Sequence, residues 1–120
     1  MPISRIVLYA QDMGETIRFY EEHFGFVSTQ REGDRMVELA HPEGGVNLMI
    51  HKAGRGQRDG QSVVKLVFDV EDVENFHATC KRKGLAFGTL HRGDGYLFAN
   101  ARDPSNNPIS ISSRAFRQHQ

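Results

Sequence analysis

Two cationic side chains occupy matching places in the sequence and could bind an anion together. Arg5 and Lys65 lie 60 positions apart, and each precedes an apolar run that ends near an aspartate, Asp12 or Asp72. A guanidinium and an ammonium that converge on one cavity bind a carboxylate, phosphate or enolate through charge-assisted hydrogen bonds. Two other interpretations stay open: charged residues at strand starts commonly lie at a solvated rim, and Asp69 could neutralise one cation internally.

Among the six histidines, His51 is the candidate for chemistry. Histidine titrates near neutral pH, so its ring can act as a general base or as a metal ligand. Glu38 is the nearby carboxylate that could form a non-standard metal pair with His51. The sequence contains no HxH or HExxH spacing, which leaves a metal site elsewhere without support. The simpler interpretation is that His51 merely ends a strand.

The composition excludes several classes of protein. The chain has 120 residues, and 15 Lys and Arg balance 15 Asp and Glu. It therefore lacks the basic excess that binding to nucleic acid or to a membrane surface requires. A single cysteine, Cys80, excludes an internal disulfide and suits a reducing cytosol. Neither a signal peptide nor a membrane-spanning stretch is evident, so we expect a cytoplasmic protein with no membrane or nucleic-acid partner.

The elements that position these residues repeat within the chain. We predict a single domain over 1–120, with module one at 1–52, a linker at 53–61, module two at 62–113 and a polar tail at 114–120. Each module reads as a strand, a helix and three further strands. The predicted strands cover 3–10, 26–31, 35–40 and 46–51, then 62–70, 85–90, 96–101 and 109–112. The helices begin after Asp12 and Asp72, which are good N-caps, and end at Gly25 and Gly84.

A module of about fifty residues is too small to bury a core of its own. We therefore expect two helices to cover one face of a larger, cupped sheet and to leave a concave trough for a small molecule on the other face. Side chains alternate along a strand, which predicts which of them face the trough. The ligand-binding candidates among them are Arg5, Tyr9, Asn47, Met49, His51, Lys65 and Ser110.

Two motifs connect this pattern to a known family. The run from Asp12 to Phe26 resembles the "D…FY…LGF" segment of the vicinal oxygen chelate superfamily, and the run from Asp103 to Ile111 is similar to its "DPDGN-x-IEL" ending. This superfamily includes glyoxalase I, bleomycin-resistance and fosfomycin-resistance proteins, and extradiol dioxygenases. The resemblance covers 3–113 and implies an α+β fold in which two βαβββ modules form a cupped mixed β-sheet. We also expect a homodimer, since pairing would cover the trough and the sheet edge.

The resemblance also implies where a metal would bind. Metal enzymes of the superfamily usually place four ligands on strands, and these positions fall on Arg5, Lys65, Ser110 and either Asn47 or, if the register slips by two, Met49. A divalent ion prefers imidazole or carboxylate ligands, and cationic side chains repel it. We therefore expect no metal cofactor at the usual site. The alternative is one divalent ion held by displaced ligands such as Glu38 and His51.

Three functions remain open. The favoured one is a metal-free protein that binds or sequesters an anionic or aromatic small molecule, in the manner of bleomycin-resistance proteins. The second is a glyoxalase- or dioxygenase-type enzyme, a lyase, isomerase or oxygenase. It would be metal-dependent through displaced ligands, or metal-free with His51 as the base. The third is a regulatory or partner-binding module. Whether the chain is an enzyme at all is left open.

Overall fold

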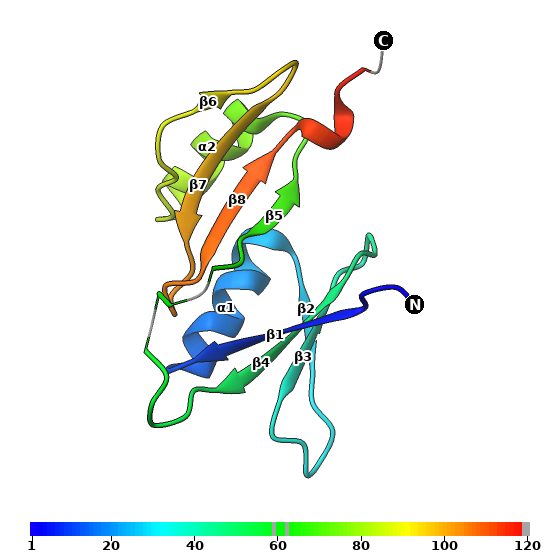
Figure 1. Ribbon diagram of the computed structural model, residues 1–120, viewed down its shortest axis with the longest axis vertical. Helices are drawn as coiled ribbons and strands as arrows, with labels where there is room; N and C mark the ends of the chain where they lie inside the picture. Colours follow the sequence, from blue (N-terminus) through cyan, green and yellow to red (C-terminus); the bar gives the residue numbers. More distant parts are fainter. Residues whose placement is uncertain (59, 62, 119–120) are drawn as a thin grey trace. The chain divides into compact units, whose positions relative to one another are not determined.

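The computed structural model describes residues 1–58, 60–61 and 63–118. The first seven elements are β1 (Arg5–Ala10), α1 (Met13–Phe24), β2 (Val27–Thr29), β3 (Val37–Ala40), β4 (Asn47–Lys52), β5 (Leu66–Asp69) and α2 (Val73–Arg82) (Figure 1). They are followed by β6 (His91–Arg92), β7 (Leu97–Arg102), β8 (Pro108–Ser112) and a short 3-10 helix, η1 (Arg114–Phe116).

The chain divides into two compact units of the same design. Unit 1 comprises Met1–Gln61 with Asp103–Asn107, and unit 2 comprises Ser62–Arg102 with Pro108–Gln120. Each holds one helix and a four-stranded sheet, in the order β1-β4-β3-β2 in sheet 1 and β5-β8-β7-β6 in sheet 2. The first pair in each sheet is parallel and the other pairs are antiparallel. The predicted α+β fold of two βαβββ modules is confirmed.

Both helices begin where the aspartates predict. The side chain of Asp12 accepts a hydrogen bond of 3.0 Å from the amide of Glu15, and that of Asp72 accepts one of 3.1 Å from the amide of Asn75. Gly25 ends α1 in the left-handed conformation, with φ of 77°. In contrast, α2 ends at Arg82, two residues before the predicted Gly84.

The strand predicted at 85–90 is wrong. The described residues form no strand there, and β6 consists only of His91–Arg92. The backbone amides of this segment make other hydrogen bonds. The amide of Leu85 donates to the carbonyl of Cys80 near the end of α2, and that of Gly88 donates to the carbonyl of Asn100. Leu85 and Phe87 are nevertheless buried. Their apolar character therefore reflects packing and not strand pairing.

Other strands are shorter than predicted. The predicted strand 26–31 is reduced to β2, since the amide of Asp34 donates to the carbonyl of Arg31 and closes a turn. The predicted strand 62–70 is reduced to β5, and residue 62 lies outside the described residues. The remaining strand ends differ from the prediction by one or two residues, as is usual at strand termini.

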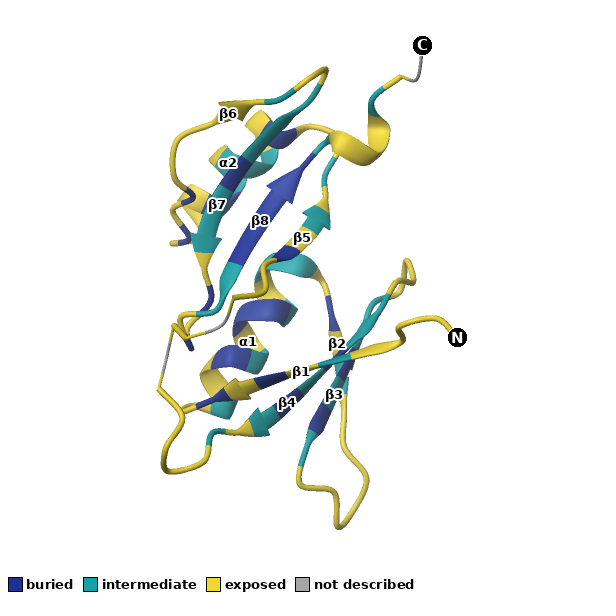
Figure 2. Ribbon diagram, in the orientation of Figure 1, coloured by how far each residue is buried: buried dark blue, intermediate teal, exposed yellow. Residues whose placement is uncertain are grey.

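The core of each unit lies between its helix and one face of its sheet. The alternation predicted for the strands is visible in β4, where Leu48 and Ile50 are buried, and β8 is dark blue along most of its length (Figure 2). On the helices, Tyr20 of α1 and Cys80 of α2 are buried. Burial raises the pKa of the Cys80 thiol, which fits the prediction of a buried apolar side chain and not of a nucleophile.

The predicted linker is tied to the end of β1. The amide of Ala53 donates to the carbonyl of Ala10, and the side chain of Gln11 donates to the carbonyl of Gln57, at 2.9 and 3.0 Å. The ammonium of Lys52 also donates to the carbonyl of Gln11. In the predicted polar tail, Arg114–Phe116 form η1, and residues 119–120 lie outside the described residues.

The turn between β7 and β8 belongs to unit 1 and packs against α1. The Tyr20 hydroxyl donates to Asp103 at 2.7 Å, and the hydroxyls of Thr16 and Ser105 lie 2.9 Å apart. Asp103 also accepts hydrogen bonds from the amides of Ser105 and Asn107, at 2.9 and 2.8 Å. One buried carboxylate thus orders the turn and attaches it to the helix.

Asn106 in this turn has a positive φ of 63°, a conformation that costs a side chain with a branched Cβ about 1–2 kcal/mol. We expect Asn106→Val to lower the free energy of unfolding by that amount and Asn106→Gly to change it by less than about 0.5 kcal/mol. Urea denaturation measures both variants. Equal losses in the two would show that contacts of the asparagine side chain matter more than its backbone conformation.

Candidate functional site

Each sheet has a second face, which we term its helix-free face. Strand alternation and register place Arg5, Val7, Tyr9, Glu38, Asn47, Met49 and His51 on this face of sheet 1. In sheet 2 the same face carries Val67, Asp69, Phe98, Asn100, Ser110 and Ser112, and Lys65, just before β5, contacts it through Asn100. Val7, Tyr9 and Val67 are 42%, 47% and 57% exposed. These faces therefore present apolar side chains among polar ones.

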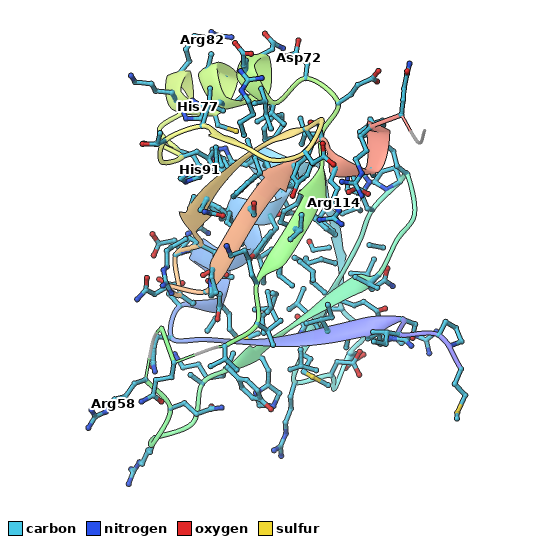
Figure 3. The ribbon with its side chains drawn as sticks, turned by 45° about the horizontal axis from the view of Figure 1, so that its top comes forward. Arg58, Asp72, His77, Arg82, His91 and Arg114 are labelled. Carbon is cyan, nitrogen blue, oxygen red and sulfur yellow. The ribbon has the colours of Figure 1, made fainter. Side chains whose placement is uncertain are left out.

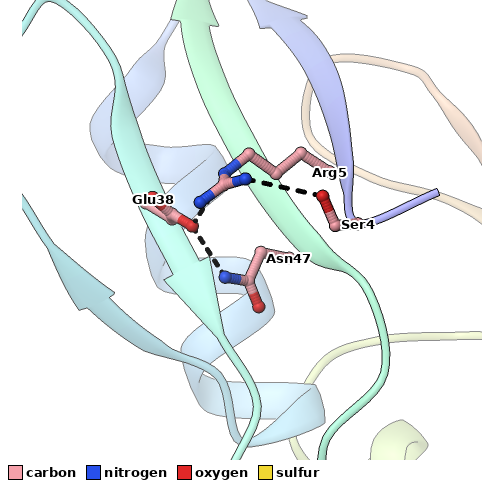
Figure 4. A network of polar contacts seen from close by, with 4 residues as sticks. All are labelled: Ser4, Arg5, Glu38 and Asn47. Carbon is pink, nitrogen blue, oxygen red and sulfur yellow. Dashed lines mark hydrogen bonds and ion pairs between the residues drawn. The ribbon is translucent and has the colours of Figure 1, made fainter. Parts of the chain in front are cut away.

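On sheet 1 a polar network surrounds Arg5 (Figure 4). The guanidinium donates to Glu38 at 3.3 Å and to the hydroxyl of Ser4 at 3.4 Å, and the Asn47 amide donates to the same Glu38 oxygen at 2.6 Å. The partner that neutralises Arg5 is thus Glu38 on β3, whereas the sequence suggested Asp69 as the internal partner of one of the two cations. Arg5 is exposed, so this ion pair contributes little to stability.

Strand register shows which residues of the two modules are equivalent. Val7 pairs with Met49, and Val67, its counterpart in the repeat, pairs with Ser110. Met49 is therefore the structural counterpart of Ser110, which decides between the two positions that the sequence left open. One strand further on, Glu38 lies opposite Met49 and Asn100 lies opposite Ser110. Glu38 and Asn100 are thus also counterparts.

Sheet 2 repeats the contact around Arg5 with a different acceptor. The Lys65 ammonium donates to the amide oxygen of Asn100 at 3.0 Å. The hydroxyl of Ser110 donates to the carbonyl of Ala99 at 3.0 Å, and this serine is only 3% exposed. The Ser110 hydroxyl therefore bonds within the sheet. In contrast, Lys65 is exposed and Asn100 is half-buried.

His51 lies beside Tyr9 on sheet 1. The two residues are register partners, and their ring centroids are 5.3 Å apart. Nδ1 of His51 lies 2.8 Å from the carbonyl of Lys52, so this nitrogen donates. In the neutral ring Nε2 is then an acceptor, which is the state that a general base requires.

The residues present do not fit the divalent metal that the resemblance implies. Glu38, the carboxylate of the alternative metal pair, already accepts hydrogen bonds from Arg5 and Asn47. Its register partner on β4 is Met49, two residues before His51. Within the described ranges, no group of three or more His, Cys, Asp or Glu side chains could hold a metal ion. A guanidinium beside the carboxylate also opposes a second cation.

The other histidines of the described chain have structural contacts. His41 Nε2 donates to the carbonyl of Phe24 at 2.7 Å, while Nδ1 accepts from the amide of Glu43 at 3.0 Å. His77, on α2 (Figure 3), lies 2.9 Å from the carbonyl of Gly88. His91 in β6 stacks on Phe98, with 5.0 Å between the ring centroids.

Sequence reasoning missed two residues of sheet 2 and one interaction in unit 1. Phe98 and Asn100 lie in a strand that was predicted, so alternation alone could have placed them on the helix-free face. The bond between Tyr20 and Asp103 had no local signal, because it joins residues 83 positions apart.

No helix in the described part of the chain is long and apolar enough to cross a membrane.

The duplicated βαβββ design and the position of its polar residues define a class of small α+β proteins with paired modules. The family model described as "Glyoxalase/Bleomycin resistance protein/Dioxygenase superfamily" matches residues 3–111, and the chain belongs to this family. A sequence comparison with curated proteins found no match.

Solved structures share the fold at low sequence identity. UcmS2 has a TM-score of 0.78 at 20% identity, covering 94% of this chain and 98% of that one. TnmS3, described as an antibiotic binding protein from Streptomyces sp. CB03234, has a TM-score of 0.77 at 18% identity, covering 92% and 93%. A lactoylglutathione lyase from Agrobacterium tumefaciens has a TM-score of 0.72 at 18% identity, covering 92% of both chains.

Proposed function

We propose that this protein binds and sequesters an anionic or aromatic small molecule without a metal ion. The observation that carries the proposal is Arg5, which stands at a position where metal-dependent relatives are expected to hold a ligand. It donates to Glu38, which also accepts from the Asn47 amide. The exposed apolar side chains beside this network offer contact area for a ring or an aliphatic group. The antibiotic-binding description of TnmS3 supports a binding role within the same fold.

The predicted ligand-binding residues keep distinct roles in this proposal. On sheet 1, Tyr9 and Met49 would contact the apolar part of a ligand, and Arg5, Asn47 and His51 would contact its polar groups. On sheet 2, Lys65 would contact an acidic group. Ser110 would act through the sheet, since its hydroxyl is bonded to Ala99. We further propose a homodimer and a cytoplasmic location, which native mass spectrometry and cell fractionation would test.

A thermal-shift screen of the purified protein tests the proposal, combined with elemental analysis after dialysis. We expect less than 0.1 equivalent of any transition metal and a rise in Tm with at least one anionic or aromatic compound. Tyr9→Ala should reduce by more than half the rise caused by a compound bound at sheet 1, and Phe98→Ala the rise caused by a compound bound at sheet 2. Phe116→Ala removes an exposed aromatic ring in η1 and should leave the rise unchanged. A stoichiometric metal, or no shift across the panel, would contradict the proposal.

A metal-free enzyme is the second candidate. It is favoured by Nε2 of His51, which is an acceptor in the neutral ring, and by the neighbouring ring of Tyr9, which carries a hydroxyl group. The lactoylglutathione lyase among the similar structures supports testing lyase chemistry. Turnover by the dialysed protein that His51→Gln abolishes would favour the enzyme over the binding protein. Turnover that persists in His51→Gln would exclude His51 as the base.

A further inference from the structure

The two modules repeat one contact but not its charge. Arg5 and Lys65 are counterparts in the repeat, and so are their acceptors Glu38 and Asn100. In sheet 1 the acceptor is a carboxylate, so the pair with Arg5 is neutral. In sheet 2 the acceptor is an uncharged amide, so the pair that Lys65 forms with it has a net positive charge. An anion therefore gains more from sheet 2 than from the network around Arg5.

The pair in sheet 2 also has donors to spare. An ammonium has three N–H donors and an amide has two. Lys65 uses one of its donors on the Asn100 oxygen, 3.0 Å away, and this contact fixes the ammonium beside the amide group. A carboxylate accepts several hydrogen bonds and is bound most strongly when at least one donor is charged. Lys65 and Asn100 together supply a charged and a neutral donor.

An aromatic surface lies next to this pair on the same face. Phe98 is two residues from Asn100 on β7, a separation of about 7 Å along a strand. The ring of His91 stacks on Phe98 with an interplanar angle of 29°. A planar ring that lies against Phe98 would place an attached acidic group near Asn100.

The remaining charge on this face limits the ligand to one acidic group. Asp69 lies opposite Ser112, which in turn lies opposite Phe98. It is four residues from Lys65, about 13 Å along the strand. A second anionic group at the aromatic end would meet this carboxylate and be repelled.

Resting on the proposed function, we infer that Lys65 and Asn100 bind the acidic group of the ligand, and that the ligand is an aromatic monocarboxylate whose ring lies against Phe98. The inference assigns the anionic end to sheet 2. Arg5, already paired with Glu38, contributes less to the binding of an acidic group.

Isothermal titration with 3-phenylpropionate and its neutral analogue 3-phenylpropanamide tests this assignment. The two probes share a ring and a two-carbon spacer and differ only in charge. We expect the acid to bind at least tenfold more tightly than the amide. Asn100→Asp gives Lys65 the carboxylate partner that Arg5 has, and it should remove this preference. Lys65→Met should do the same, whereas Lys65→Arg should retain it.

The matched control is Asn75→Asp, which makes the same change of charge in the exposed first turn of α2. It should leave the preference for the acid within twofold of its original value. Because Lys65 is exposed and precedes β5, Lys65→Met tests the inference even if Asn100→Asp fails to fold. Equal affinity of the acid and the amide, or a preference that survives Lys65→Met, would overturn the inference.

These results separate the inference from the proposed function. A protein that binds other compounds but shows no preference for the acid refutes only the assignment to Lys65 and Asn100. A protein that holds a stoichiometric metal, or binds nothing in the screen, refutes the proposed function itself.

Discussion

Asp103→Ala should lower the free energy of unfolding by about 3 kcal/mol. The carboxylate is 4% exposed and accepts hydrogen bonds from the Tyr20 hydroxyl and from both amides of the turn, those of Ser105 and Asn107. Alanine leaves these donors without an acceptor in a buried place, and each unsatisfied donor costs about 1–3 kcal/mol before water enters. Urea denaturation followed by circular dichroism measures the loss.

Tyr20→Phe is the control that removes one of these bonds and keeps the carboxylate. It should cost about 1–1.5 kcal/mol, because Asp103 retains its contacts with the turn. A loss in Asp103→Ala no larger than that in Tyr20→Phe would mean that the turn is held by other contacts, and that the carboxylate does not order it.

The same pair of residues predicts how stability depends on pH. Burial raises the pKa of Tyr20, and the adjacent Asp103 raises it further through its charge and hydrogen bond. The unfolded tyrosine titrates near pH 10, so above about pH 10 the unfolded state loses a proton that the folded state keeps. Stability should then fall by up to about 1.4 kcal/mol per pH unit from this group. Tyr20→Phe should lack this contribution, which denaturation curves at pH 9 and 11 would show.

The helix starts and the strand alternation could be predicted from the sequence because both depend on nearby residues. An aspartate followed by an amphipathic run specifies an N-cap, and Asp12 and Asp72 both accept the expected amide bonds. Alternation along β4 correctly placed Leu48 and Ile50 in the core. The two family motifs, Asp12 to Phe26 and Asp103 to Ile111, are also in contact, since the Tyr20 hydroxyl of the first donates to Asp103 of the second.

Features that depend on strand register could not be predicted. The counterpart of Ser110 is Met49 and not Asn47, which only the pairing of β1 with β4 and of β5 with β8 decides. The contact of Arg5 with Glu38 crosses from β1 to β3, so no local pattern reveals it. Residues 85–90 misled the prediction because burial and strand pairing produce the same apolar composition.

Ile50→Ala and Ile111→Ala should each lower the free energy of unfolding by about 3 kcal/mol. These residues occupy corresponding positions in β4 and β8, and both are 0% exposed. Removing three carbon atoms from a packed core costs the transfer free energy of those atoms and leaves a cavity. Val63→Ala, at a fully exposed position, is the matched control and should change stability by less than about 0.5 kcal/mol.

The two variants also test the prediction that 1–120 form a single domain. A module of about fifty residues buries too little surface to be stable alone, so loss of either core should unfold the whole chain. The chain passes between the two units more than once, because Asp103–Asn107, between β7 and β8, belongs to unit 1. Both variants should therefore shift one transition, with coincident fluorescence and circular dichroism curves. Two separate transitions, each sensitive to only one variant, would instead show that the modules fold independently. A ligand that binds one module would then stabilise only that module.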